Sequence, residues 1–93
     1  MELHRNLEMS LSREEFFRLL PAAVGPFEVD GDTARWSDGN RRWTIRLVPL
    51  ADHRLGSVVV HRHRVEIALE SHSEAEGEAF MDRFHLGFLR GGG

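Results

Sequence analysis

The chain begins with an alternation of apolar and polar residues, which is the pattern of a half-buried β-strand. Over residues 2–11 the apolar side chains share one parity and the polar side chains the other, with Arg5 as the exception. A two-residue period of this kind places one face of a strand on a core and the other in water. Shorter extended runs follow at residues 27–29 and 33–36, and a cleaner alternation covers residues 41–48. We predict a strand at each of these positions.

The last extended run, residues 58–70, is the longest in the chain. It exceeds the usual length of a strand, so we predict one long strand that contains a bulge. Asp-Gly pairs at residues 30–31 and 38–39 separate the earlier runs and are typical of hairpin turns. Pro49 ends the strand before the long run, and we predict a loop over residues 51–57.

Two helices are predicted, each beginning at a Ser-x-x-Glu capping box. Ser12 and Glu15 begin the first helix, because the hydroxyl and the carboxylate can each satisfy a backbone N–H group. Pro21 removes a donor and clashes with the preceding turn, so we expect this helix to kink or end near Leu20. The second helix begins at residues 73–76 and stops at the terminal glycines. It carries a phenylalanine at every fourth position, which makes a stripe along one face: Phe80, Phe84 and Phe88.

The order β-α-β-β-β-β-α predicts an α+β fold with a single antiparallel five-stranded sheet. We expect a single domain over residues 1–90 and a flexible glycine tail at residues 91–93. The first strand should join the sheet beside the long last strand. Both helices should pack on one face, because the opposite face carries arginines.

This element order resembles the half-repeat of TATA-binding-protein-like folds. It is also similar to a shortened helix-grip fold of plant-allergen and polyketide-cyclase relatives. The C-terminal sequence from Phe84 to Gly93 resembles a group of small uncharacterised bacterial proteins. None of these resemblances implies an activity, because function resides in particular sites and not in the fold.

Composition narrows the class of protein. The 41% of hydrophobic residues and 29% of charged residues are ordinary for a globular domain. There is no cysteine, which excludes disulfides, thiolate metal ligands and cysteine nucleophiles. The N-terminal residues lack the apolar core of a signal peptide, and no apolar run reaches the length needed to span a bilayer. We expect a cytoplasmic protein without membrane association.

The net charge of −3 hides a basic segment between two acidic ones. Residues 35–64 contain seven arginines and two acids, a charge of +5, whereas each flank carries −4. Guanidinium groups grip carboxylate and phosphate with paired hydrogen bonds. Strand parity places five of these arginines on the polar face of the predicted sheet: Arg35, Arg42, Arg46, Arg62 and Arg64.

We predict that these five arginines bind an acidic protein or a phosphorylated ligand. The alternative is an ordinary solvated face, in which the arginines pair with Glu8, Glu66 and Glu70 for about 0–1 kcal/mol each. Nucleic acid is a less favoured partner, because no aromatic side chain shares the arginine parity and the whole chain is acidic. Two other hypotheses are a small-molecule pocket between the sheet and the C-terminal helix, and a homodimer built on an edge strand or the aromatic helix.

The sequence contains few residues arranged to catalyse a reaction or to bind a metal. His61 and His63 share one face of the last strand and are candidate metal ligands. The alternative is a pair of partly buried histidines that bond to backbone. A third ligand could come only from residues chosen by type: His4, His53 and His72. We therefore expect no metal and no cofactor.

The glycine tail is similar to that of ubiquitin-like and sulfur-carrier proteins, but there the tail follows a strand and here it follows a predicted helix. No nucleophile-elbow serine, glycine-rich phosphate loop or HExxH motif is present. We expect a binding module and not an enzyme.

Overall fold

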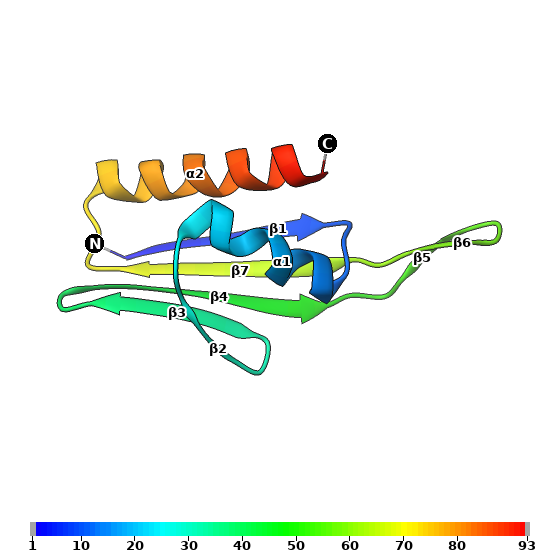
Figure 1. The fold of residues 1–93 in the computed structure, drawn as a ribbon, viewed down its shortest axis with the longest axis horizontal. Coiled ribbons are helices and arrows are strands. Elements are labelled where there is room, and N and C mark those ends of the chain that lie inside the picture. The colour runs from blue at the N-terminus through cyan, green and yellow to red at the C-terminus, as the bar shows by residue number, and fades with distance from the viewer. Residues whose placement is uncertain (1, 93) are drawn as a thin grey trace.

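A computed structural model describes the backbone of residues 2–92 and the side chains of residues 2–88. A five-stranded antiparallel sheet carries two helices on one face, and a two-stranded hairpin extends from one end of the sheet (Figure 1). The elements, in chain order, are β1 (Leu3–Met9), α1 (Arg13–Val24), β2 (Glu28–Asp30), β3 (Thr33–Asp38), β4 (Arg41–Pro49), β5 (His53–Leu55), β6 (Val58–Val60), β7 (His63–Glu70) and α2 (Glu74–Gly92).

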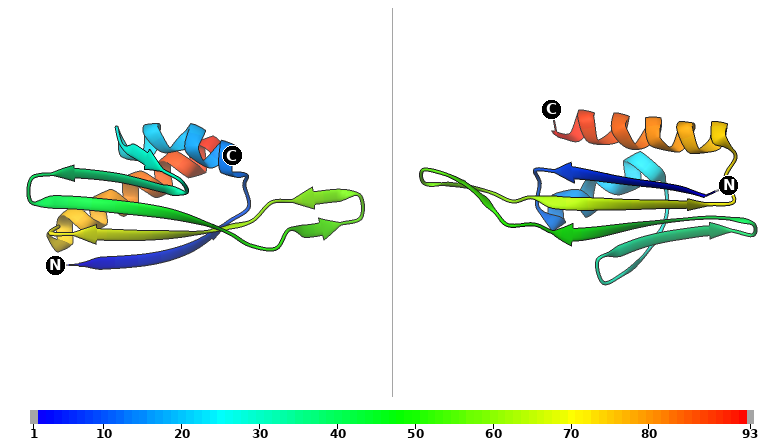
Figure 2. Two further views of the ribbon diagram at one scale, coloured as in Figure 1. Left: turned by 90° about the horizontal axis from the view of Figure 1, so that it is seen from below. Right: turned by 180° about the vertical axis from the view of Figure 1, so that it is seen from behind.

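The predicted α+β architecture is confirmed. The strand order is β1-β7-β4-β3-β2, so the first strand lies at an edge beside the last. Leu3 pairs with Leu69 at one end of β1, and Met9 pairs with His63 at the other. Figure 2 shows α1 and α2 on the same side of this sheet.

The core forms between the two helices and the apolar face of the sheet. Buried side chains of β4 and β7 lie opposite one another in register: Trp43 with Leu69, Ile45 with Ile67, and Leu47 with Val65. The ring of Phe16 from α1 stacks on Phe88 from α2 at a centroid distance of 5.1 Å. Phe84 is fully buried, and the half-buried Phe80 lies 5.6 Å from the Trp43 ring. The predicted phenylalanine stripe is therefore part of the core.

The two helices approach each other closely at Gly87. A Cβ atom built there would lie 2.5 Å from the Cβ of Ala23 on α1 and 2.8 Å from its Cα. Both distances are shorter than carbon atoms tolerate, so only glycine fits at this crossing. The small pair of Gly87 and Ala23 thus sets how near α2 comes to α1.

The first helix was expected to kink or end near Leu20, and it does not end there. The helix passes through Pro21 and ends at Val24, where the N–H of Gly25 donates to the carbonyl of Pro21 at 2.9 Å. Pro21 itself is exposed, while Ala23 and Val24 are buried in the core. Burial of these two side chains in a continued helix outweighs the one hydrogen bond that proline removes.

The predicted loop at residues 51–57 and the predicted strand at residues 58–70 are also corrected. Residues 53–60 form a separate hairpin, in which β5 and β6 pair across a turn at Gly56 with φ of 63°. The long run breaks at His61 and Arg62 before β7 begins. Glycine readily adopts a positive φ, so the chain can reverse its direction at Gly56. The hairpin forms although residues 53–55, before the turn, include few strong strand formers.

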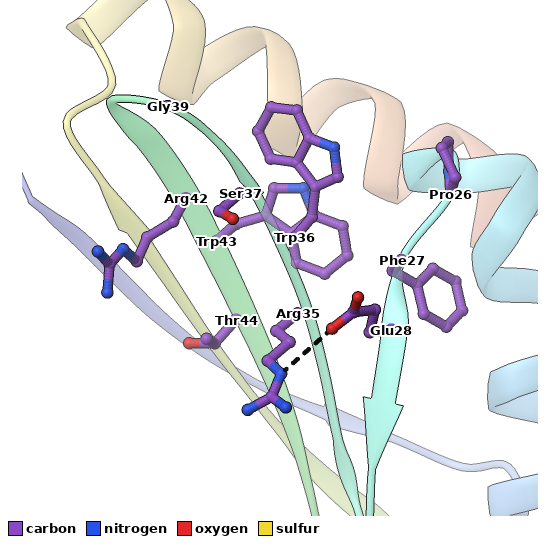
Figure 3. Close-up of a pocket in the computed structure, with 10 residues that line it drawn as sticks. All are labelled: Pro26, Phe27, Glu28, Arg35, Trp36, Ser37, Gly39, Arg42, Trp43 and Thr44. Atoms are coloured by element: carbon purple, nitrogen blue, oxygen red, sulfur yellow. Dashed lines mark ion pairs between the residues drawn. The ribbon is translucent and has the colours of Figure 1, made fainter.

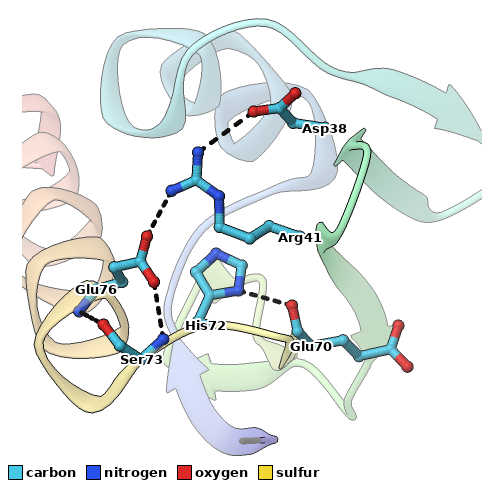
Figure 4. A network of polar contacts seen from close by, with 6 residues as sticks. All are labelled: Asp38, Arg41, Glu70, His72, Ser73 and Glu76. Atoms are coloured by element: carbon cyan, nitrogen blue, oxygen red, sulfur yellow. Dashed lines mark hydrogen bonds and ion pairs between the residues drawn. The ribbon is translucent and has the colours of Figure 1, made fainter.

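Both predicted capping boxes are confirmed, and the second anchors α2 to the sheet (Figure 4). The N–H of Ser73 donates to Glu76 Oε1 at 2.8 Å, and the N–H of Glu76 donates to Ser73 Oγ at 3.1 Å. Arg41, at the start of β4, donates to Glu76 Oε2 at 2.6 Å and to Asp38 at 3.3 Å. The Ser73 N–H and then the Arg41 guanidinium lower the pKa of Glu76 below 4.5, its ordinary value. The hydrogen bond to Glu76 in turn raises the pKa of Arg41.

This network predicts a pH-dependent contribution to stability. Because the pKa of Glu76 is lower in the folded chain, its contribution is present above about pH 4.5 and is lost as the pH falls further. We expect Glu76→Gln to lower the free energy of unfolding at pH 7 and to lower it progressively less toward pH 3. Urea unfolding across this range measures the difference. Glu14→Gln removes an exposed charge from the first turn of α1 and is the control, so an equal pH trend in that variant would contradict the assignment.

Candidate ligand-binding groove at the edge of the sheet

The five predicted arginines lie together on the side of the sheet that faces away from the helices. Arg42 and Arg46 belong to β4, Arg64 to β7 and Arg35 to β3, all on the parity opposite to the core residues. Arg62 immediately precedes β7. We call this surface the arginine face. Strand parity, which is a property of the sequence alone, was sufficient to predict it.

Acidic side chains from outside the basic segment of residues 35–64 accompany every arginine on this face. Cross-strand register sets Arg42 opposite Glu70, Arg46 opposite Glu66, and Arg64 opposite Glu8. The nitrogen-to-oxygen distances are 3.3 Å for Arg42–Glu70, 3.9 Å for Arg46–Glu66, 3.2 Å for Arg64–Glu66, 2.8 Å for Arg62–Glu8, 3.9 Å for Arg35–Glu28 and 3.8 Å for Arg35–Asp30. The three ion-pair partners expected under the alternative interpretation are all present. The face therefore alternates in charge and is not uniformly cationic.

Two of these arginines also line a groove that passes around the edge of β3 (Figure 3). This groove, which we call the β3 groove, has a volume of about 670 Å³. Its walls come from β2, β3, β4 and the segment that leads into β2. Arg35 and Arg42 lie at its polar side, and three aromatic residues lie at its other side: Phe27, Trp36 and Trp43.

The β3 groove exists because β2 is short. β2 pairs only with residues 33–35 of β3, so within residues 2–92 no strand pairs with the outer side of residues 36–38. The chain approaches β2 through Gly25 and Pro26, and Pro26 lacks the N–H that strand pairing would need. The backbone edge of Trp36–Asp38 is thereby left open for an extended segment to pair with it.

The aromatic wall is only partly exposed. Trp43 forms the floor and is 3% exposed, with its ring 6.2 Å from that of Phe27. Trp36 lies opposite Trp43 in the strand register and is half-buried. In Figure 3 the two indoles point to the helix side of the sheet, whereas Arg42 and Thr44 point to the other side. A ligand in the groove would thus meet an apolar ring and a guanidinium on either side of one strand edge.

The sequence did not identify the aromatic members of this site. Trp36 and Trp43 lie on the apolar parity of their strands, which predicts a core position for both. The sequence carried no clear signal for this groove, because the predicted runs at residues 27–29 and 33–36 are similar in length, whereas β3 extends to Asp38. A short strand beside a longer one leaves part of the longer edge unpaired.

The two candidate metal ligands have separate partners. His61 is exposed, with Nδ1 3.2 Å from Asp52 Oδ1. His63 is half-buried, with Nδ1 2.8 Å from the carbonyl oxygen of Leu11, as expected for a histidine that bonds to backbone at the end of the sheet. His72 is buried and bonds the Glu70 carbonyl at 2.9 Å. Among the described residues, no group of three or more side chains has the arrangement of a metal site.

A second groove, of about 510 Å³, lies between β1 and α2. We call it the β1 groove. It occupies the side of the sheet and helix where a small-molecule pocket was expected, but at the outer edge and not beneath the phenylalanine stripe.

Comparison with known proteins adds no assignment. No protein-family model matches the chain, and no curated protein or solved structure matches it. Among residues 2–92, no helix combines the length and apolar character required to cross a membrane.

Proposed function

We propose that the protein is a non-enzymatic binding module that holds an acidic or phosphorylated partner. The observation that supports this proposal is the β3 groove, which joins Arg35 and Arg42 to a half-buried indole and an unpaired strand edge. An extended peptide fits this combination best. Its backbone would pair with residues 36–38, its anionic groups would meet the guanidiniums, and an apolar side chain would cover Trp36.

The ion pairs on the arginine face do not prevent such binding. The Arg35 and Arg42 side chains are 55% and 63% exposed, and their pairs with Glu28 and Glu70 are correspondingly weak, about 0–1 kcal/mol each. A ligand phosphate or carboxylate that makes two parallel hydrogen bonds can displace these carboxylates. The volume of the β3 groove, about 670 Å³, lies within the usual range for ligand sites, roughly 300–1,000 Å³.

The test compares two pairs of arginines on the same face. The probe is an extended peptide that carries glutamates beside one aromatic residue, together with its phosphoserine counterpart. We expect Arg35→Gln combined with Arg42→Gln to weaken binding about tenfold or more, because charge-assisted hydrogen bonds contribute about 1.5–3 kcal/mol each. Arg46→Gln combined with Arg64→Gln lies outside the β3 groove and is the matched control, with an expected change of about threefold or less.

Trp36 provides the signal for this titration. It is the more exposed of the two tryptophans, so its emission should change when a peptide covers it, and Trp36→Phe should abolish most of that change. Affinity should also fall as salt rises. If the wild-type chain binds neither peptide, the proposed function is wrong. If both arginine pairs weaken binding equally, the β3 groove is not the binding site.

A further inference from the structure

The β5–β6 hairpin projects from the end of the sheet, away from both helices (Figures 1 and 2). We call residues 53–60 the arm. It contributes to an elongated molecule with extents of 48 × 25 × 20 Å. A two-stranded hairpin is at best marginally stable in water when nothing packs on it. We therefore expect another surface to cover the arm and stabilise it.

Both faces of the arm expose apolar side chains. Register pairs Leu55 with Val58 and His53 with Val60, so these four side chains share a face. Leu55 is 59% exposed, Val58 57%, and Val59 on the other face 43%. These three belong to the five large hydrophobic residues that are exposed in the described part of the chain. Such a concentration on a short projection marks an interaction surface, because scattered single exposures are the norm elsewhere.

The β1 groove offers a matching surface. Its apolar floor consists of Leu3, Leu7 and Met81, all half-buried. Its rim consists of Glu74, Glu78 and Asp82 from α2, against a single arginine, Arg5. The outer edge of β1 has no neighbouring strand in residues 2–92, so its backbone groups are open along the whole groove.

The arm and the β1 groove complement each other in three respects. Val59, which shares a face of the arm with Arg54, meets the apolar floor, and a strand edge meets a strand edge. Arg54 on that same face meets the acidic rim, because the arm has no acid between residues 53 and 60 and the groove has a net charge of −2. We propose that the arm of one copy of this chain docks in the β1 groove of a second copy.

The arm cannot reach the β1 groove of its own chain, because it points away from it. β1 ends at Met9, opposite His63, and the arm begins beyond that point (Figure 1). The same geometry makes the exchange reciprocal. β6 continues the line of β7, and its flank on the β1 side is left open. When the β1 of a second copy lies along this flank of β6, the arm of that second copy lies along the β1 of the first copy. Two equal contacts then close a two-fold symmetric dimer.

This interface is independent of the proposed function. It uses β1, at the opposite edge of the sheet from β3, and no residue of the β3 groove. Peptide binding and dimerisation can therefore succeed or fail separately.

The test is a charge exchange followed by sedimentation velocity of the full chain. We expect a dimer in the micromolar range. Arg54→Glu and Glu78→Arg should each raise the dimer dissociation constant about tenfold or more, whereas the double variant should recover most of the wild-type affinity. Val59→Asp should give a monomer, because Val59 shares the face of Arg54, and Val29→Asp is its control, because Val29 is 51% exposed on β2 at the far edge.

Circular dichroism is the control for folding. Each variant must retain the wild-type spectrum, so that a change in dimerisation can be attributed to the interface. A wild-type chain that stays monomeric at about 100 μM overturns the proposal, whether or not its arm binds anionic vesicles instead. A dimer that survives Val59→Asp and Arg54→Glu also overturns it, because the copies would then meet through another surface. Recovery in the charge-exchanged double variant supports it, since a purely structural effect of either substitution would not be reversed.

Discussion

Phe84→Ala is expected to lower the free energy of unfolding by about 3–5 kcal/mol. The Phe84 ring is fully buried, and it lies 4.7 Å from the Phe88 ring within the core between the sheet and the two helices. Removing it forfeits the transfer free energy of the ring and leaves a cavity that the rigid sheet cannot close. Urea unfolding followed by circular dichroism measures the loss.

This loss is large relative to the total free energy of unfolding of a domain of this size. Small domains unfold with a free energy of about 5–15 kcal/mol, so Phe84→Ala should bring the chain close to the threshold of folding at 37 °C. Leu86→Ala is the control on the same helix, because Leu86 is 53% exposed and should cost about 0.5 kcal/mol or less. Equal losses in the two variants would show that α2 does not pack on the sheet through its phenylalanine stripe.

Gly87→Ala is the second substitution with a large expected effect. The added methyl group would meet Ala23 Cβ at 2.5 Å and Cα at 2.8 Å, so the two helices would have to separate. Overpacking of this kind costs about 1–3 kcal/mol, which exceeds the gain of about 1 kcal/mol from replacing glycine within a helix. We expect a net loss of stability in thermal unfolding.

Gly77→Ala is the matched control on the same helix. Its Cβ would lie 3.3 Å from Leu3 Cδ2, the end of a flexible side chain, so we expect a neutral or stabilising change. Combining Gly87→Ala with Ala23→Gly should cost less than the sum of the single changes, because the contact atoms are removed from one side. A Gly87→Ala variant as stable as Gly77→Ala would contradict the close helix crossing.

The sequence predicted those parts of the fold that depend on local periodicity. Parity along residues 41–48 and 63–70 identified both the core side of the sheet and the arginine face, because successive side chains of a strand must point to opposite faces. The capping boxes at Ser12 and Ser73 located the starts of both helices within a residue. These features need no knowledge of which strand lies beside which.

Features that depend on strand length and path were predicted less well. The β3 groove results from β2 stopping short of Trp36, which a run of three extended residues does not reveal. The arm was missed because its first strand contains few strand-forming residues and is stabilised by pairing with β6. The end of α1 was misplaced because Pro21 dominates local propensity, whereas burial of Ala23 dominates in the folded chain.

The charge of the arginine face also depends on which strands lie side by side. Local composition gave residues 35–64 a charge of +5, yet the acids that pair with the arginines come largely from outside that segment. Glu8 meets Arg62, and Glu28 meets Arg35, only because β1 and β2 border the sheet. Charge counted along a sequence therefore overstates the field of a surface that several strands build together.

The pairing of the first strand with the last has a consequence for how the chain folds. β1 joins residues that lie 54 to 66 positions away along the chain, whereas β3 and β4 are adjacent. Closing so long a loop costs entropy that no local turn offsets, so β1 is expected to gain its partner only after β7 has found β4. During synthesis β1 must remain unpaired until about residue 70 has been added. Residues 3–70 are thus the smallest unit that can complete the sheet.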